Sequence, residues 1–151
     1  MNKQSFKNVI LFSAVAVITS LIFCNSFSDF AHSHASSNAI TEIVLPHEYA
    51  TNETVLLVVR KLAHIVEFAA LGCVVFLLVH SLVKKYSLLG YALFYVLLVG
   101  VIDEHIQSFS DRANSTGDVI LDFCGALIGF LVVWLASKVY RKFKEHRNNK
   151  R

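Results

Sequence analysis

Four long runs of apolar residues, separated by clusters of charged residues, make up most of the chain. Each run is about 17–22 residues long, enough for a helix to cross a hydrocarbon core of about 30 Å. The pattern therefore predicts an all-α, polytopic membrane protein with four transmembrane helices, forming a single domain over residues 1–151. The predicted helices span about 8–28, 62–83, 86–106 and 119–137, with a polar loop at 29–59 and a basic tail at 138–151.

The composition agrees with this interpretation, because 55% of the residues are apolar and only 17% are charged. A signal peptide is the alternative for the first run, since Lys3 and Lys7 precede it. However, the run is longer than the roughly 7–15 apolar residues of a signal peptide, and no clear cleavage site follows it. We therefore interpret the first run as a retained helix.

The distribution of Lys and Arg predicts the orientation, because basic residues concentrate in cytoplasmic loops. Basic residues precede the first run, Lys84 and Lys85 separate the second and third, and seven basic residues lie in the 138–151 tail. The 29–59 loop has four acidic residues and no Lys or Arg. Both termini are therefore predicted to be cytoplasmic, with the loop outside the cell membrane. Topology and lipid headgroups account for the basic tail, so no nucleic-acid partner is predicted.

Acidic residues inside the apolar runs are the main candidate functional residues, because charge at membrane depth is costly and usually faces a protein interior or a water-filled cavity. Counting at 1.5 Å per residue from the basic borders places Glu67, Asp103 and Asp122 at a common depth of about 24–27 Å. Four more polar residues come just above them, at about 28–33 Å: His64, Glu104, Gln107 and Asp118. Their helical spacing predicts that all seven side chains face one outward-facing polar pocket.

Interhelical pairing is the alternative for any one of these residues, because a buried acid must find a partner. Arg60, Lys61 and Arg112 are the available cations. Pairing alone does not require five acids, a His and a Gln at one level of the membrane.

Gly125 and Gly129 have the GxxxG spacing and continue the polar stripe of the fourth run. This spacing lets another helix approach closely. We therefore expect a close helix–helix contact there, and the same glycines suggest a homo-oligomer.

The polar residues also form two motifs that resemble the VanZ-like family. The first motif is Arg60-Lys61-x-x-His64-x-x-Glu67-Phe68-Ala69-x-Leu71-Gly72. The second is Asp103-Glu104-x-x-Gln107-Ser108-Phe109-x-x-Arg112-x-x-Ser115-x-x-Asp118-x-x-x-Asp122-x-x-Gly125-x-x-x-Gly129. The resemblance covers about residues 55–135, and more loosely the first helix. Phe68 stands where a tyrosine is common and Asp122 where an asparagine is common, which makes the predicted pocket more acidic than the family pattern.

The resemblance implies an integral membrane protein related to a teicoplanin-resistance protein. Teicoplanin carries a lipid chain and acts at the outer face of the cytoplasmic membrane, the side on which the pocket is predicted. A binding protein for an outer-leaflet amphiphile fits both observations, with a membrane lipid or lipid-linked envelope molecule as partner. Lys61, Arg60 and Arg112 would meet an anionic headgroup, and Gln107 and the acids would meet polar or cationic groups.

A membrane-embedded, metal-dependent hydrolase or transferase is the alternative. His64 or Glu67 would act as base, and these two residues together with Asp103 and Glu104 would hold the metal. We favour binding, because the sequence has no nucleophile elbow, P-loop or HExxH motif. Three basic residues would also oppose a divalent cation, so neither a metal nor another cofactor is predicted. A proton-coupled carrier is a third hypothesis, disfavoured because no acid lies at the membrane midplane.

Overall fold

The computed structural model describes residues 2–32, 53–82, 88–109 and 116–149. These residues form four α-helices and no strand, which confirms the predicted all-α fold: α1 (Lys3–His32), α3 (Glu53–Leu82), α4 (Leu89–Ser108) and α5 (Thr116–Asn148). Each helix is long and apolar enough to cross a membrane. The four predicted transmembrane helices are therefore present.

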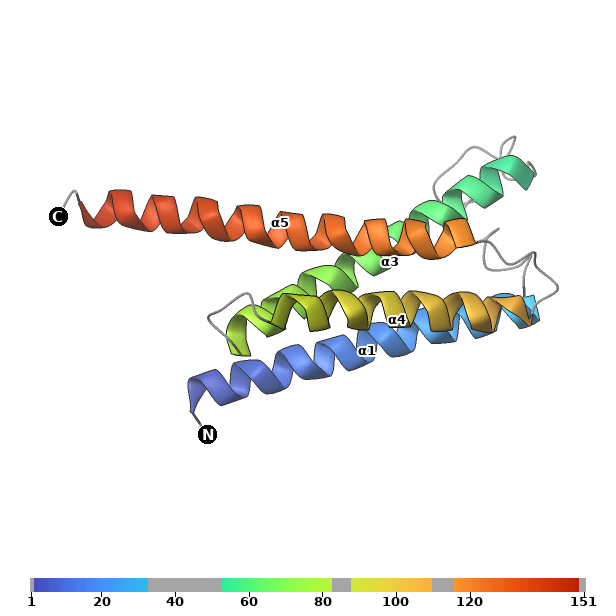
Figure 1. The fold of residues 1–151 in the computed structure, drawn as a ribbon, viewed down its shortest axis with the longest axis horizontal. Coiled ribbons are helices and arrows are strands. Elements are labelled where there is room, and N and C mark those ends of the chain that lie inside the picture. The colour runs from blue at the N-terminus through green and yellow to red at the C-terminus, as the bar shows by residue number, and fades with distance from the viewer. Residues whose placement is uncertain (1, 33–52, 83–87, 110–115, 150–151) are drawn as a thin grey trace.

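The helices form a bundle in which α3 contacts each of the other three (Figure 1). Helices α1 and α4 lie side by side on one side of α3, and α5 packs against α3 on the other. The chain begins and ends at the same end of the bundle (Figure 1). This arrangement is what an even number of crossings requires, whereas the cytoplasmic location of that end stays a prediction.

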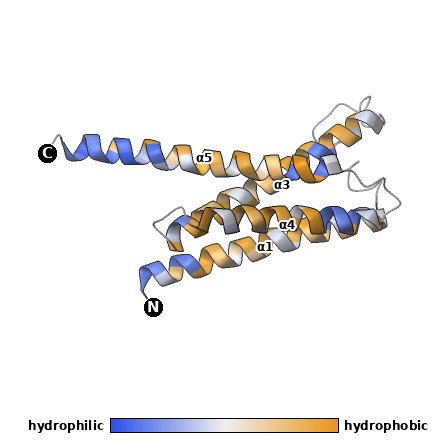
Figure 2. Cartoon of the chain, viewed as in Figure 1, coloured by the Kyte–Doolittle hydropathy of each residue, from blue (hydrophilic) through white to orange (hydrophobic). Residues whose placement is uncertain are grey.

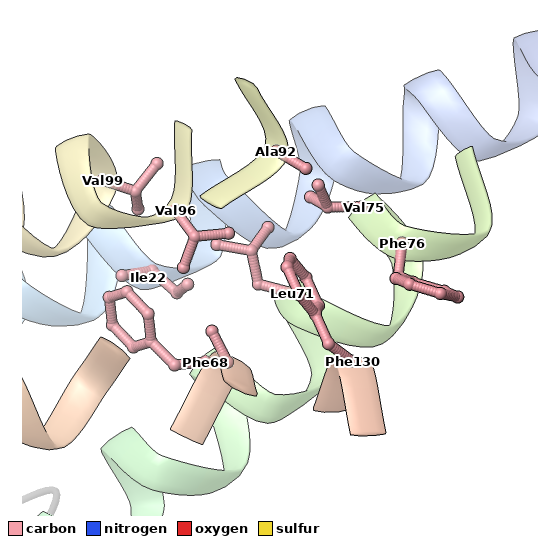
Figure 3. Close-up of a cluster of buried hydrophobic side chains, with 10 residues drawn as sticks. Ile22, Phe68, Leu71, Val75, Phe76, Ala92, Val96, Val99 and Phe130 are labelled. Atoms are coloured by element: carbon pink, nitrogen blue, oxygen red, sulfur yellow. The ribbon is translucent and has the colours of Figure 1, made fainter. Parts of the chain in front are cut away.

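The interior of the bundle is a small apolar core to which all four helices contribute. Phe68 and Leu71 of α3 are fully buried, and they lie among Ile22 of α1, Val96 of α4 and Phe130 of α5 (Figure 3). Many other large apolar residues are exposed on the outer surface. Figure 2 shows that apolar residues predominate along the middle of the helices. An apolar exterior of this extent is what a lipid-facing surface needs.

The helices extend beyond the predicted membrane runs. Helix α3 begins at Glu53, inside the predicted 29–59 loop, and α5 continues to Asn148, through most of the predicted 138–151 tail. A helix of this length covers about 50 Å, more than the hydrocarbon core. In α5 the extension is rich in Lys and Arg, which are good helix formers and continue the helix into water. In α3 the extension at 54–59 is itself mostly apolar, and Arg60 and Lys61 separate it from the predicted run.

Helices α3 and α5 approach most closely, because three glycines leave no side chain between them: Gly72, Gly125 and Gly129. A Cβ added at Gly125 would lie 2.7 Å from the carbonyl oxygen of Ile65, and one at Gly129 would clash with the backbone of Ala69. The close contact predicted from GxxxG is thus present within one chain. The homo-oligomer through these glycines stays a prediction, although α3 already covers their Cα atoms.

Candidate functional site

Three helices each contribute one polar side chain to a buried group near the end of the bundle opposite the termini. The Nδ1 atom of His64 on α3 lies 3.7 Å from Oδ2 of Asp103 on α4 and 4.0 Å from Oδ1 of Asp122 on α5. The side chain of Asp103 is 0% exposed and that of Asp122 4%, whereas His64 retains 14%. We call these residues the His–Asp–Asp trio.

Asp103 is the most extensively hydrogen-bonded member of the trio. The hydroxyl of Ser26 on α1 donates to its Oδ1. The side-chain amide of Gln107 donates to its Oδ2 at 2.8 Å, across one turn of α4. Gln107 also accepts a hydrogen bond of 3.1 Å from the guanidinium of Arg60 on α3. One connected network therefore links α1, α3 and α4 around a buried carboxylate.

Two more exposed pairs connect the helices around the trio, and we call them the rim pairs. Lys61 of α3 and Asp118 of α5 form an ion pair of 2.7 Å, with side chains 51% and 32% exposed. Both residues lie one helical turn from a trio member, toward the end of the bundle opposite the termini. The second pair is formed by Asn25 of α1, whose amide donates to Glu67 at 2.5 Å.

The structure therefore gives most of the predicted site residues a definite place. The trio contains three of them, while Gln107, Lys61, Asp118 and Glu67 bond to residues of neighbouring turns or helices. Glu104 is half-buried beside Asp103 in the sequence of α4. Arg112 lies outside the described residues. The outward-facing pocket itself stays a prediction.

Ser26 belongs to the network and Asn25 to a rim pair, but neither residue was predicted from the sequence. Both lie in the first apolar run, which was treated only as a membrane anchor. The same depth count would have found them, because Asn25 lies 18 residues beyond Lys7, at about 27 Å. The signal was thus present, and it shows that α1 contributes to the site.

The orientation of Ser26 bears on the chemistry that the site can support. A serine nucleophile is activated when its hydroxyl donates to an imidazole that acts as general base. Here the hydroxyl of Ser26 donates to the carboxylate of Asp103, and His64 faces the same carboxylate from another helix. The arrangement holds Asp103 in place, and it differs from that of a serine hydrolase.

The comparisons with known proteins give one result. Comparison with curated proteins and with solved structures yields no match. The model of the VanZ/LLP1 family matches residues 4–137, which include α3, α4, nearly all of α1, the first two thirds of α5 and every member of the trio. The match confirms the resemblance found in the two sequence motifs and, more loosely, in the first helix. The chain therefore belongs to the VanZ/LLP1 family.

Proposed function

We propose that the chain is a membrane-embedded binding protein for the polar headgroup of an outer-leaflet amphiphile, either a membrane lipid or a lipid-linked envelope molecule. The observation that carries this proposal is that the exposure of the polar side chains increases toward the end of the bundle opposite the termini. Buried groups such as Asp103 lie deepest, and the Lys61–Asp118 pair is exposed nearer the end. A headgroup held there would leave its acyl chains beside the apolar exterior.

The orientation of the bundle supports an extracytoplasmic site. His64 and Asp122 lie in the first half of α3 and α5, and Asp103 lies near the end of α4. These parts of the helices lie toward the end of the bundle opposite both termini (Figure 1). The positive-inside rule puts the basic tail of α5 in the cytoplasm. These two observations support the proposal that the polar end of the bundle faces the outer leaflet.

The charges of the rim favour an anionic or zwitterionic headgroup. Lys61 is half-exposed, and its ammonium group is bonded to the partly exposed carboxylate of Asp118. A phosphate can replace a carboxylate on an ammonium group with little loss, because both make charge-assisted hydrogen bonds. Asp118 would then be free to meet a cationic part of the same headgroup, which suits a zwitterionic lipid.

The link to glycopeptide resistance follows from family membership and belongs to the same proposal. Teicoplanin is an amphiphile that acts at the outer face of the membrane. A protein that binds a lipid-linked envelope molecule at that face could limit the access of the antibiotic to its target. Resistance would then result from binding, without chemical change of the antibiotic.

Native mass spectrometry of the purified protein tests the proposal. We expect wild-type protein extracted with native lipid to retain phospholipid, and Lys61→Gln to retain about tenfold less, because it loses a charge-assisted contact. Lys7→Gln is the matched control. It removes the same charge from an exposed residue near the beginning of α1, at the opposite end of the bundle. Equal retention by Lys61→Gln and wild type would contradict the proposal, as would equal losses in the two variants.

A further inference from the structure

We propose that His64, Asp103 and Asp122 form a binding site for one divalent transition-metal cation, of the Zn²⁺ or Mn²⁺ type. The three side chains come from α3, α4 and α5, and one donor atom of each lies within 4.8 Å of the other two. This metal site is separate from the headgroup-binding site proposed above. The metal would be bound by the buried trio, and the headgroup by the exposed rim pairs.

The distances fit such a cation. Two ligands at about 2.1 Å from a tetrahedral ion are about 3.4 Å apart. The imidazole Nδ1 of His64 is 3.7 Å from Asp103 and 4.0 Å from Asp122. The donors of Asp103 and Asp122 lie within 4.8 Å of each other. Side-chain shifts of up to about 1 Å would therefore bring the three donors onto one ion. Because each donor comes from a different helix, the ion would also join α3, α4 and α5.

The charge balance supports a cation at this position. The carboxylates of Asp103 and Asp122 are both almost fully buried, and a buried charge is costly unless it is paired or coordinates a metal. A divalent cation balances two carboxylates, while a neutral imidazole adds a ligand without adding charge.

Two of the three basic residues that counted against a metal in the sequence bond to partners outside the trio, whereas the third, Arg112, lies outside the described residues. Lys61 is paired with Asp118 at the rim. Arg60 donates to the amide oxygen of Gln107, so at least this bond is not directed at the trio. Lys61 and Arg60 thus each bond to a partner outside the trio, while the charge of Arg60 also acts on Asp103.

The surroundings of Asp103 are those of a supported ligand. Metal-bound carboxylates are usually fixed by hydrogen bonds from neighbouring groups, which set their orientation. Ser26 and Gln107 supply one such bond to each oxygen of Asp103. Each carboxylate oxygen can accept more than one bond, so Oδ2 can accept from Gln107 and still bind a metal.

The donor types indicate which cation the site would take. Imidazole nitrogen suits Zn²⁺ and related ions, carboxylate oxygen suits Mn²⁺ and Mg²⁺, and thiolate would select softer metals. Among the described cysteines, the thiol of Cys73 bonds to the carbonyl of Gly129, and Cys24 and Cys124 are exposed. One nitrogen and two oxygens therefore favour Zn²⁺ or Mn²⁺. Three protein ligands leave at least one position for water or another oxygen ligand.

Metal titration of the full chain in lipid nanodiscs tests the site. After treatment with chelator, the protein is titrated with Mn²⁺ and followed by electron paramagnetic resonance, and Zn²⁺ is then added as a competitor. We expect one ion per chain. His64→Ala and Asp122→Asn should each weaken binding by about 100-fold or more, because loss of a supporting group alone costs about 10–100-fold.

Two controls match these ligand variants. His80→Ala removes another imidazole from α3, one that stacks on Phe76, and Glu145→Gln neutralises an exposed acid near the end of α5. Both should bind Mn²⁺ as the wild type does. Ser26→Ala, which keeps all three ligands, should weaken binding by about tenfold. Helical circular dichroism reports whether each variant is folded.

Three results would overturn the metal site. One is the absence of stoichiometric binding to folded wild-type protein, and another is equal binding by the ligand variants and their controls. The third is Mn²⁺ binding that is lost in Lys61→Gln but retained in His64→Ala. Lipid retention measured before and after chelation separates this inference from the proposed function, because either activity can be lost while the other persists.

Discussion

The imidazole Nδ1 of His64 on α3 lies 3.7 Å from Oδ2 of Asp103 on α4, inside a bundle whose outer surface is apolar. The two residues are 39 positions apart in the sequence, and only the folding of α3 against α4 brings them together. Because Ser26 and Gln107 also bond to Asp103, this carboxylate connects α1 and α4 and faces α3. Its removal should therefore affect the whole bundle.

We expect Asp103→Ala to lower the free energy of unfolding by about 1–3 kcal/mol, because Ser26 and Gln107 lose their buried acceptor. Asp118→Ala is the comparison, since it removes a carboxylate from a more exposed ion pair and should cost less than about 1 kcal/mol. Reversible unfolding in mixed micelles, followed by circular dichroism, measures both. Equal effects of the two substitutions would show that Asp103 does not organise the bundle.

The glycines of the α3–α5 contact give a second prediction. Gly129→Ala should destabilise the bundle by about 1–3 kcal/mol, because the new Cβ would clash with the backbone of Ala69 and force the helices apart. Gly90→Ala has nothing within 4 Å of the added atom, and it should be neutral or slightly stabilising. The same unfolding measurement applies.

Gly100→Ala separates steric effects from simple burial. Gly100 is buried, yet an added Cβ would lie at ordinary contact distances, 3.6 Å from the ring of Phe68 and 3.7 Å from Cβ of Asp122. We therefore expect it to behave like Gly90→Ala. If Gly100→Ala lost as much stability as Gly129→Ala, close helix packing would not be the cause of the destabilisation by Gly129→Ala.

The fold could be predicted from the sequence to a large extent, because apolar length alone sets the number of membrane helices. The depth count predicts Asp103 and Asp122 at one level, since helix geometry fixes the rise per residue, and in the structure both carboxylates face His64. Glu67 illustrates the limit of that count, because equal depth does not determine side-chain direction. Its carboxylate bonds to Asn25, whereas His64, one turn away, joins the trio. Which helix faces which depends on packing that no single helix encodes.

The orientation in the membrane gives a third prediction. In a variant without the native cysteines, Ser36→Cys in the predicted outer loop should react with an impermeant maleimide in intact cells. Asn149→Cys, just after the end of α5, should react only after permeabilisation, because the basic tail is predicted to be cytoplasmic. The opposite pattern would place the trio at the inner leaflet and refute the proposed outer-leaflet site.

The last prediction decides between binding and catalysis. We expect purified wild-type protein, incubated with native lipid extract and Mn²⁺ or Zn²⁺, to leave the lipids chemically intact in mass spectrometry. The reason is geometric, since the hydroxyl of Ser26 donates to Asp103 and is not activated by an imidazole. A metal site with an open position could still activate water, so the experiment needs a chelator and His64→Ala beside the wild type. Product that requires metal and disappears in both controls would establish the hydrolase alternative. Intact lipid with metal bound would mean that the ion serves to hold α3, α4 and α5 together.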